Sequence, residues 1–75
     1  MKTLKGCEFQ KASDVDREYA SFELMIDDEI ILEVGFSDDG EFQVFFEYAA
    51  PGLLVTWSEF QACIERGREL AELDR

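Results

Sequence analysis

Paired carboxylates are the groups in this chain whose type and spacing come nearest to a catalytic arrangement. They stand side by side at Asp27-Asp28 and again at Asp38-Asp39. General acid or base catalysis needs one carboxyl group that is desolvated in a pocket. Aspartates in turns are solvated, and Asp is an ordinary turn residue. We therefore interpret both pairs as turn residues, and we expect no catalytic residues in the chain.

The sequence does not indicate a metal or cofactor site. It contains no histidine, the commonest metal ligand and general base. The run Asp14-x-Asp16-x-Glu18 resembles the start of a calcium loop, but Tyr19 stands where that loop has glycine and Met25 where it has glutamate. The five glycines are scattered and form no phosphate-binding loop. We expect no bound metal, no cofactor and no enzymatic activity.

The two cysteines, Cys7 and Cys63, are too far apart in sequence to indicate a zinc site. Cys63 falls on the apolar stripe of a predicted helix, which favours a packed thiol over a reactive one. Two interpretations stay open: reduced thiols in a cytoplasmic protein, the default without a secretory segment, or a disulfide between them. No stretch approaches the ~20 apolar residues of a membrane span. We expect a cytoplasmic protein that does not enter membranes.

Period-two alternation of apolar residues predicts three antiparallel strands, over residues 21–26, 29–36 and 41–48. Turn residues separate them. Directly opposed residues of antiparallel strands share a face. Pairing Ile26 with Ile30 and Phe36 with Phe42 keeps the apolar faces together and gives hairpin loops of about three and five residues. The strand over 29–36 is then central.

A helix is predicted after the strands, from about Trp57 to Leu73. The motif Thr56-x-x-Glu59 is a capping box, in which the threonine side chain accepts from the amide of the glutamate. Gly67 lies on the apolar stripe of this helix. Glycine costs up to ~1 kcal/mol in a helix interior. We therefore expect the helix to approach the sheet closely at this position.

These elements predict a single α+β domain over residues 1–75: an antiparallel β-meander of three to four strands with one C-terminal helix packed on one face. Residues 3–10 alternate weakly and are the candidate fourth strand. The predicted core consists of Phe22, Leu24, Ile26, Ile30, Leu32, Val34, Phe36, Phe42, Val44, Phe46, Phe60, Ile64 and Leu70.

Acidic residues dominate the charge of the chain, and they are concentrated in its middle. The net charge is −11, and residues 12–59 hold thirteen acidic residues against a single basic one, Arg17. An apolar content of 47% separates the chain from acidic disordered segments. Such a surface repels nucleic acid and anionic membranes and attracts basic proteins. Charge that serves solubility alone is the other interpretation.

The sheet face away from the helix is the predicted binding surface. In the expected register it has an apolar centre of Met25, Ile31 and Phe45 within a ring of glutamates. The predicted partner-binding residues are Glu23, Asp27, Asp28, Ile31, Glu33, Asp38, Asp39, Phe45 and Glu47. An apolar centre with an acidic rim would fit a basic protein. There are two alternatives. The N-terminal strand or a second copy of the chain covers this face, or the face is an ordinary solvated one with a few exposed apolar residues.

The predicted function is non-catalytic binding: a stoichiometric inhibitor that docks onto a basic protein, such as a nuclease or another nucleic-acid-binding protein, without binding nucleic acid itself. By class only, the short acidic profile resembles bacterial or phage-encoded toxin-immunity proteins, anti-CRISPR proteins and DNA mimics. This resemblance rests on no shared motif and carries over no residues. The alternative is a small structural subunit that self-associates through its sheet as a homodimer.

Overall fold

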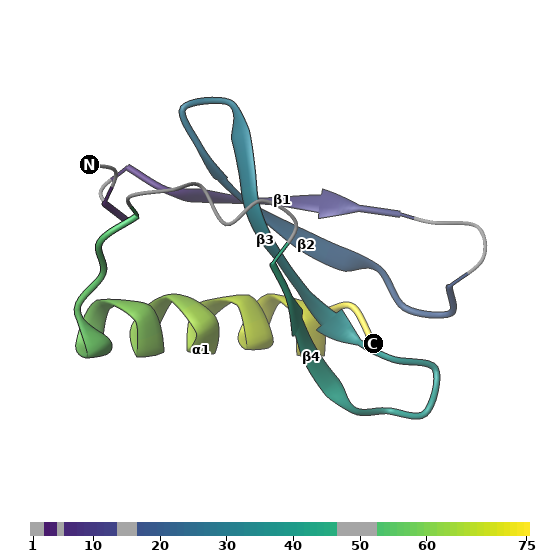
Figure 1. Cartoon of the computed structure of the whole chain (residues 1–75). Helices are drawn as coiled ribbons and strands as arrows, with labels where there is room; N and C mark the ends of the chain where they lie inside the picture. The colour runs from purple at the N-terminus through teal and green to yellow at the C-terminus, as the bar shows by residue number, and fades with distance from the viewer. Residues whose placement is uncertain (1–2, 5, 14–16, 47–52) are drawn as a thin grey trace.

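The structure is a computed structural model that describes residues 3–4, 6–13, 17–46 and 53–75. Within these residues the chain forms β1 (Glu8–Ala12), β2 (Ser21–Ile26), β3 (Glu29–Phe36), β4 (Phe42–Phe45) and α1 (Trp57–Leu73). The strands pair antiparallel in the order β1-β2-β3-β4, and α1 lies across one face of the sheet (Figure 1). The predicted α+β meander with one C-terminal helix is confirmed, and its fourth strand lies at 8–12 rather than 3–10.

The hairpin between β2 and β3 is tighter than the apolar alternation predicts. Ile26 pairs with Glu29 rather than with Ile30, so the loop consists of Asp27 and Asp28 alone. Both aspartates have positive φ, 50° and 66°, as a type I′ turn requires. This turn matches the right-handed twist of paired strands, and Asp enters the left-handed region more readily than most residues. The preference for a two-residue type I′ loop therefore overrides the predicted pairing of Ile26 with Ile30.

A β-bulge in β3 restores the predicted register beyond the turn. Leu24 pairs with Leu32 as expected, but the next pair is Met25 with Ile30, so Ile31 is an extra residue in β3. Ile31 is only 1% exposed and belongs to the core. Ile30 is half-buried and takes the opposite side of the sheet, beside Met25. The predictions that Ile31 is exposed and that Ile30 is a core residue are both wrong.

The hairpin between β3 and β4 has the predicted five-residue loop. Phe36 pairs with Phe42 across it. The Ser37 N–H donates to the Glu41 carbonyl over 2.8 Å, and the Gly40 N–H donates to the Ser37 carbonyl over 2.9 Å. Gly40 has a φ of +86°, a conformation that glycine adopts without strain. Local hydrogen bonds therefore fix this turn in the register that the apolar pattern predicts.

Strand β4 ends at Phe45, earlier than the alternation over 41–48 predicts. Phe46 is 56% exposed, so the prediction that it belongs to the core is wrong. Residues 47–52 lie outside the described part of the chain, and the predicted site residue Glu47 is among them. The candidate surface is therefore built without Glu47.

Helix α1 begins at the predicted capping box and approaches the sheet at the predicted glycine. The Glu59 N–H donates to Thr56 Oγ1 over 3.1 Å, and the Thr56 hydroxyl donates to Glu59 Oε1 over 2.8 Å. A Cβ at Gly67 would stand 2.7 Å from Val34 Cγ2 and 2.9 Å from Phe9 Cζ. The close approach that the glycine predicts is confirmed, and it presses α1 against β1 and β3.

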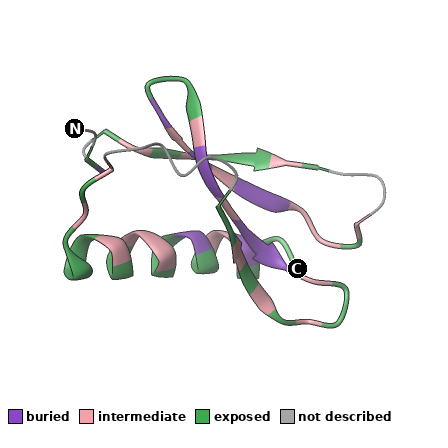
Figure 2. Ribbon diagram, viewed as in Figure 1, coloured by how far each residue is buried: buried purple, intermediate pink, exposed green. Residues whose placement is uncertain are grey.

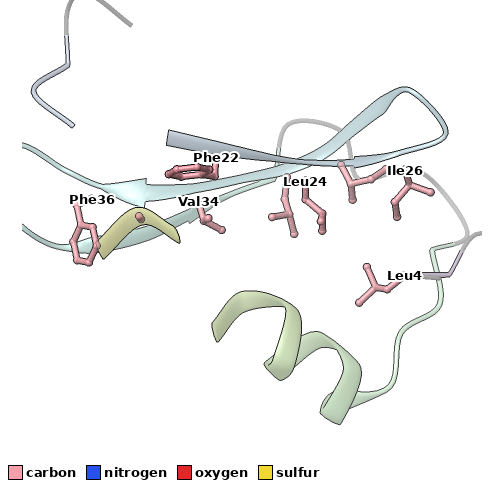
Figure 3. Close-up of a cluster of buried hydrophobic side chains, with 9 residues drawn as sticks. Leu4, Phe22, Leu24, Ile26, Val34 and Phe36 are labelled. Carbon is pink, nitrogen blue, oxygen red and sulfur yellow. The ribbon is translucent and has the colours of Figure 1, made fainter. Parts of the chain in front are cut away.

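The core lies between the sheet and α1. Phe22, Leu24, Val34 and Phe36 project from the strands into this layer (Figure 3). The buried residues follow the middle of the sheet and the inner face of the helix (Figure 2). The buried apolar residues are Leu4, Phe22, Leu24, Ile26, Ile31, Leu32, Val34, Phe36 and Ala71.

Candidate binding surface

The sheet face opposite α1, which we call the open sheet face, carries the residues of the candidate site. Phe9 and Val34 contact the helix at Gly67, so the residues that alternate with them point the other way. Of the elements in the described ranges, none lies on this face (Figure 1). Its side chains are Glu8, Gln10, Ser21, Glu23, Met25, Ile30, Glu33, Gln43 and Phe45.

One row of directly paired residues crosses the open sheet face from β1 to β4. Gln10 pairs with Glu23, Glu23 with Glu33, and Glu33 with Phe45. Directly opposed residues have Cβ atoms about 4.5–5.5 Å apart, so these side chains are neighbours. The Gln10 amide donates to Glu23 Oε1 over 3.4 Å. Phe45 is 61% exposed at the end of the row.

The charge of Glu33 is compensated within the chain. Arg17 NH1 lies 3.5 Å from Glu33 Oε1, and Arg17 NH2 donates to the Phe36 carbonyl over 3.5 Å. The Glu33 side chain is only 18% exposed. Glu23, in contrast, accepts from the neutral amide of Gln10, and no base among the described residues forms an ion pair with it. Glu23 is therefore the strongest candidate in this row for contact with a basic partner.

A second row supplies the apolar part of the surface. Glu8 pairs with Met25, and Met25 pairs with Ile30. Met25 and Ile30 are both half-buried. Because of the bulge, Ile30 takes the place that the sequence analysis assigns to Ile31. The apolar side chains of the open sheet face are therefore Met25 and Ile30 in this row, and Phe45 at the end of the first row.

The two aspartate pairs lie at opposite ends of the sheet. Asp27 and Asp28 form the turn before β3, and Asp38 and Asp39 lie in the turn after it (Figure 1). All four are exposed. A strand as long as β3 spans roughly 25 Å at about 3.3 Å per residue, so the structure does not bring the pairs together. They extend the negative field at both ends of the open sheet face rather than forming one cluster.

A shallow hollow opens beside the paired residues Glu33 and Phe45. Its volume is about 510 Å³, and its lining also includes Arg17, Gln43 and Asp38. The Asp38 carboxylate accepts from the backbone N–H of Glu18 over 3.1 Å, which ties the preceding segment to this rim. The hollow combines one base, two acids and an exposed ring. Such a lining can receive a side chain of a protein partner.

The described residues contain no group of three or more Cys, Asp or Glu side chains placed to hold a metal ion. Among them, every buried side-chain nitrogen or oxygen has a hydrogen-bond partner. The pKa of the Cys63 thiol is raised to about 12, first by burial and then by the neighbouring Cys7. The sequence is compatible with reduced or with paired cysteines, and the structure describes Cys7 and Cys63 as free thiols.

A cluster of aromatic rings at the start of α1 is a surface feature that the sequence pattern does not predict. The rings of Phe46 and Phe60 are stacked with centroids 6.5 Å apart, and the Trp57 ring lies 6.5 Å from that of Phe60. Trp57 and Phe46 are exposed. The alternation and the helical stripe assigned these residues to buried faces, so no sequence signal distinguished them from core residues.

No protein family, curated protein or solved structure matches the chain. The class that the fold defines is therefore a four-stranded antiparallel α+β domain. Of the helices in the part of the chain that the structure describes, none has the length and apolar content to cross a lipid bilayer.

Proposed function

We propose that the chain is a non-catalytic acidic binding protein that inhibits its partner stoichiometrically. The open sheet face docks onto a basic, nucleic-acid-handling protein such as a nuclease. The observation that carries this proposal is the row in which the carboxylate of Glu23 and the exposed Phe45 share one face that no strand or helix of the described residues covers. An aromatic anchor flanked by acidic residues is complementary to a basic protein surface.

In this proposal the surface has two working parts. Phe45 supplies the apolar anchor, with Met25 and Ile30 in the second row of the same face, and Glu23 supplies the carboxylate that replaces a phosphate of the nucleic acid. The exposed aspartates at both ends of the sheet and the net charge of −11 accelerate encounter with a basic protein. Inhibition is then steric and electrostatic, because the partner cannot hold this domain and a nucleic acid at one site.

The proposal also covers the setting in which the protein works. We place it in the cytoplasm of a bacterium or of a phage-infected cell, among the toxin-immunity, anti-CRISPR and DNA-mimic classes of inhibitor. The support is the combination of a short acidic domain with two free thiols. A cytoplasmic compartment keeps such thiols reduced.

The experiment that tests this function is capture followed by competition. The immobilised chain is exposed at low salt to a lysate cleared of nucleic acid, and the captured protein is purified. We expect a basic protein that loses its nucleic-acid binding at one equivalent of this chain. Glu23→Lys should reduce the amount captured about tenfold, whereas Glu65→Lys, which makes the same charge change on the exposed side of α1, should leave it nearly unchanged. A partner that binds both molecules at once would overturn the proposal.

A second function is favoured by one specific observation, the exposed aromatic edge of the sheet. β4 is an edge strand, and Phe45 and Phe46 at its end are 61% and 56% exposed. Edge strands of this kind pair readily with another chain. In this alternative the protein is a structural subunit that forms a homodimer through β4. Sedimentation at high micromolar concentration decides it, because a monomer there excludes this function.

A further inference from the structure

The structure brings the two cysteines of the chain to one place, although 56 positions separate Cys7 from Cys63 in the sequence. Cys7 directly precedes β1, and Cys63 lies in α1. Both line one hollow of about 450 Å³ between the first strand and the helix, together with Phe9 and Arg66. The Cys7 side chain lies close enough to Cys63 to raise the pKa of the Cys63 thiol. The sulfur atoms are therefore neighbours in the folded protein.

The packing on both sides holds this pair in place. Phe9 lies two residues beyond Cys7 and contacts α1 at Gly67, one turn after Cys63. On the other side the Cys7 N–H donates to the carbonyl of the buried Leu4 over 3.2 Å. Cys7 is therefore anchored on both sides beside the hollow that Cys63 also lines, and a disulfide requires the two Cα atoms to come within about 7 Å of each other.

We propose that Cys7 and Cys63 are a redox pair that closes into an intramolecular disulfide when the protein meets a low-molecular-weight disulfide such as oxidised glutathione. The Cys7 thiolate attacks one sulfur of glutathione disulfide, forms a mixed disulfide and releases one glutathione thiolate. Cys63 then gives up its proton, and its thiolate attacks Cys7 Sγ and expels the second glutathione. Two protein thiols are oxidised to one disulfide, and one glutathione disulfide is reduced to two glutathione thiols.

The surroundings of Cys63 set the order of these steps. Burial and the neighbouring Cys7 raise the pKa of Cys63 to about 12, so this thiol stays protonated at neutral pH. The thiolate is the nucleophile in disulfide exchange. The reaction therefore begins at Cys7, and the closing step becomes faster as the pH rises. At neutral pH the mixed disulfide on Cys7 should be observable before closure.

Closure would tie the edge strand β1 to the helix. A disulfide constrains the unfolded chain more strongly the longer the loop that it closes. Cys7 alternates with Glu8 and lies on the helix side of the sheet, away from the open sheet face. The inference is therefore independent of the proposed docking function and goes beyond it. In a reducing cytoplasm the pair would stay open and close only under oxidative stress.

The experiment uses the full chain in buffers with increasing ratios of oxidised to reduced glutathione, with intact mass and thermal unfolding as readouts. We expect a monomer that loses two hydrogens and gains at least about 10 °C in Tm. Cys63→Ser should instead stop at a mixed disulfide on Cys7, with no rise in Tm. A wild-type chain that gives only mixed disulfides or intermolecular dimers, or that closes without a gain in Tm, would overturn the proposal. The wild-type readouts decide the matter even if a variant fails to fold.

Discussion

Glu33 and Phe45 lie directly opposite each other on β3 and β4, and the guanidinium of Arg17 lies 3.5 Å from the Glu33 carboxylate. The most exposed aromatic residue of the open sheet face therefore stands beside an ion pair rather than beside a free acid. This arrangement moves the uncompensated charge one strand away, to Glu23. Along this row a partner would contact the Phe45 ring first, then the Arg17–Glu33 ion pair, and then the Glu23 carboxylate.

The β-bulge predicts that two adjacent isoleucines respond differently to truncation. Ile31→Ala empties a buried site and should lower the free energy of unfolding by about 2–4 kcal/mol. Ile30→Ala removes a half-buried side chain and should cost less than about 1.5 kcal/mol. Urea unfolding of both variants measures the difference. Equal costs, or a larger cost at Ile30, would show that β3 carries no bulge.

The close approach at Gly67 predicts that alanine is harmful there, although alanine is the better helix former. The added methyl group would stand 2.7 Å from Val34 Cγ2 on the stiff central strand. Overpacking of this kind costs about 1–3 kcal/mol, which exceeds the ~1 kcal/mol that helix propensity returns. We expect Gly67→Ala to lower the midpoint of urea unfolding. An unchanged or higher midpoint would mean that α1 does not approach the sheet this closely.

The type I′ turn predicts opposite effects of glycine in the two hairpins. Asp28 has a φ of 66°, so Asp28→Gly should relieve strain and raise stability by about 0.5–1 kcal/mol. Asp39→Gly also removes an aspartate carboxylate, but from the other turn. Asp39 does not have a positive φ, so glycine there only adds conformational freedom to the unfolded chain and should lower stability. Thermal unfolding of the two variants should therefore shift in opposite directions. Destabilisation by Asp28→Gly would argue against the two-residue turn.

The buried thiol predicts a loss of stability at high pH under reducing conditions. The folded state raises the pKa of Cys63 from 9.0 to about 12, so it binds this proton more tightly than the unfolded state does. The resulting stabilisation is complete below pH 9 and disappears as the pH rises toward 12. Urea unfolding at a series of pH values in this range should show a steeper decline for wild type than for Cys63→Ala. Parallel declines would contradict the pKa assignment.

The sequence predicts the elements of this fold well, because most of its signals are local. The capping box at Thr56, the five-residue loop and the packing of Gly67 all follow from short motifs and are confirmed. The prediction that Ile31 is exposed is wrong because apolar alternation cannot detect a β-bulge. The bulge in β3 reverses the side of the sheet on which the residues between the turn and the bulge lie. The sequence signal for the tighter turn is the pair Asp27-Asp28, and the structure shows that both residues have positive φ.

The candidate surface is less predictable than the fold, because it depends on contacts between distant segments. The Arg17–Glu33 ion pair joins a loop to the central strand. Arg17 is the single base among thirteen acids in residues 12–59, which is a hint that it has an internal partner but does not say which one. The sequence predicts both aspartate pairs as partner-binding residues of one surface, and the length of β3 keeps the pairs at opposite ends of that surface. Phe45 stands where the alternation placed it.

The central claim is that the open sheet face, rather than acidity in general, binds the partner. The most direct test is the association rate with the captured partner at several salt concentrations, for wild type, Glu23→Lys and the matched control Glu65→Lys. Both variants change the net charge equally, and Glu23→Lys places a base opposite Glu33, which favours folding. We predict that Glu23→Lys slows association at low salt by about tenfold and Glu65→Lys by less than about twofold. Equal slowing by the two variants would contradict the claim.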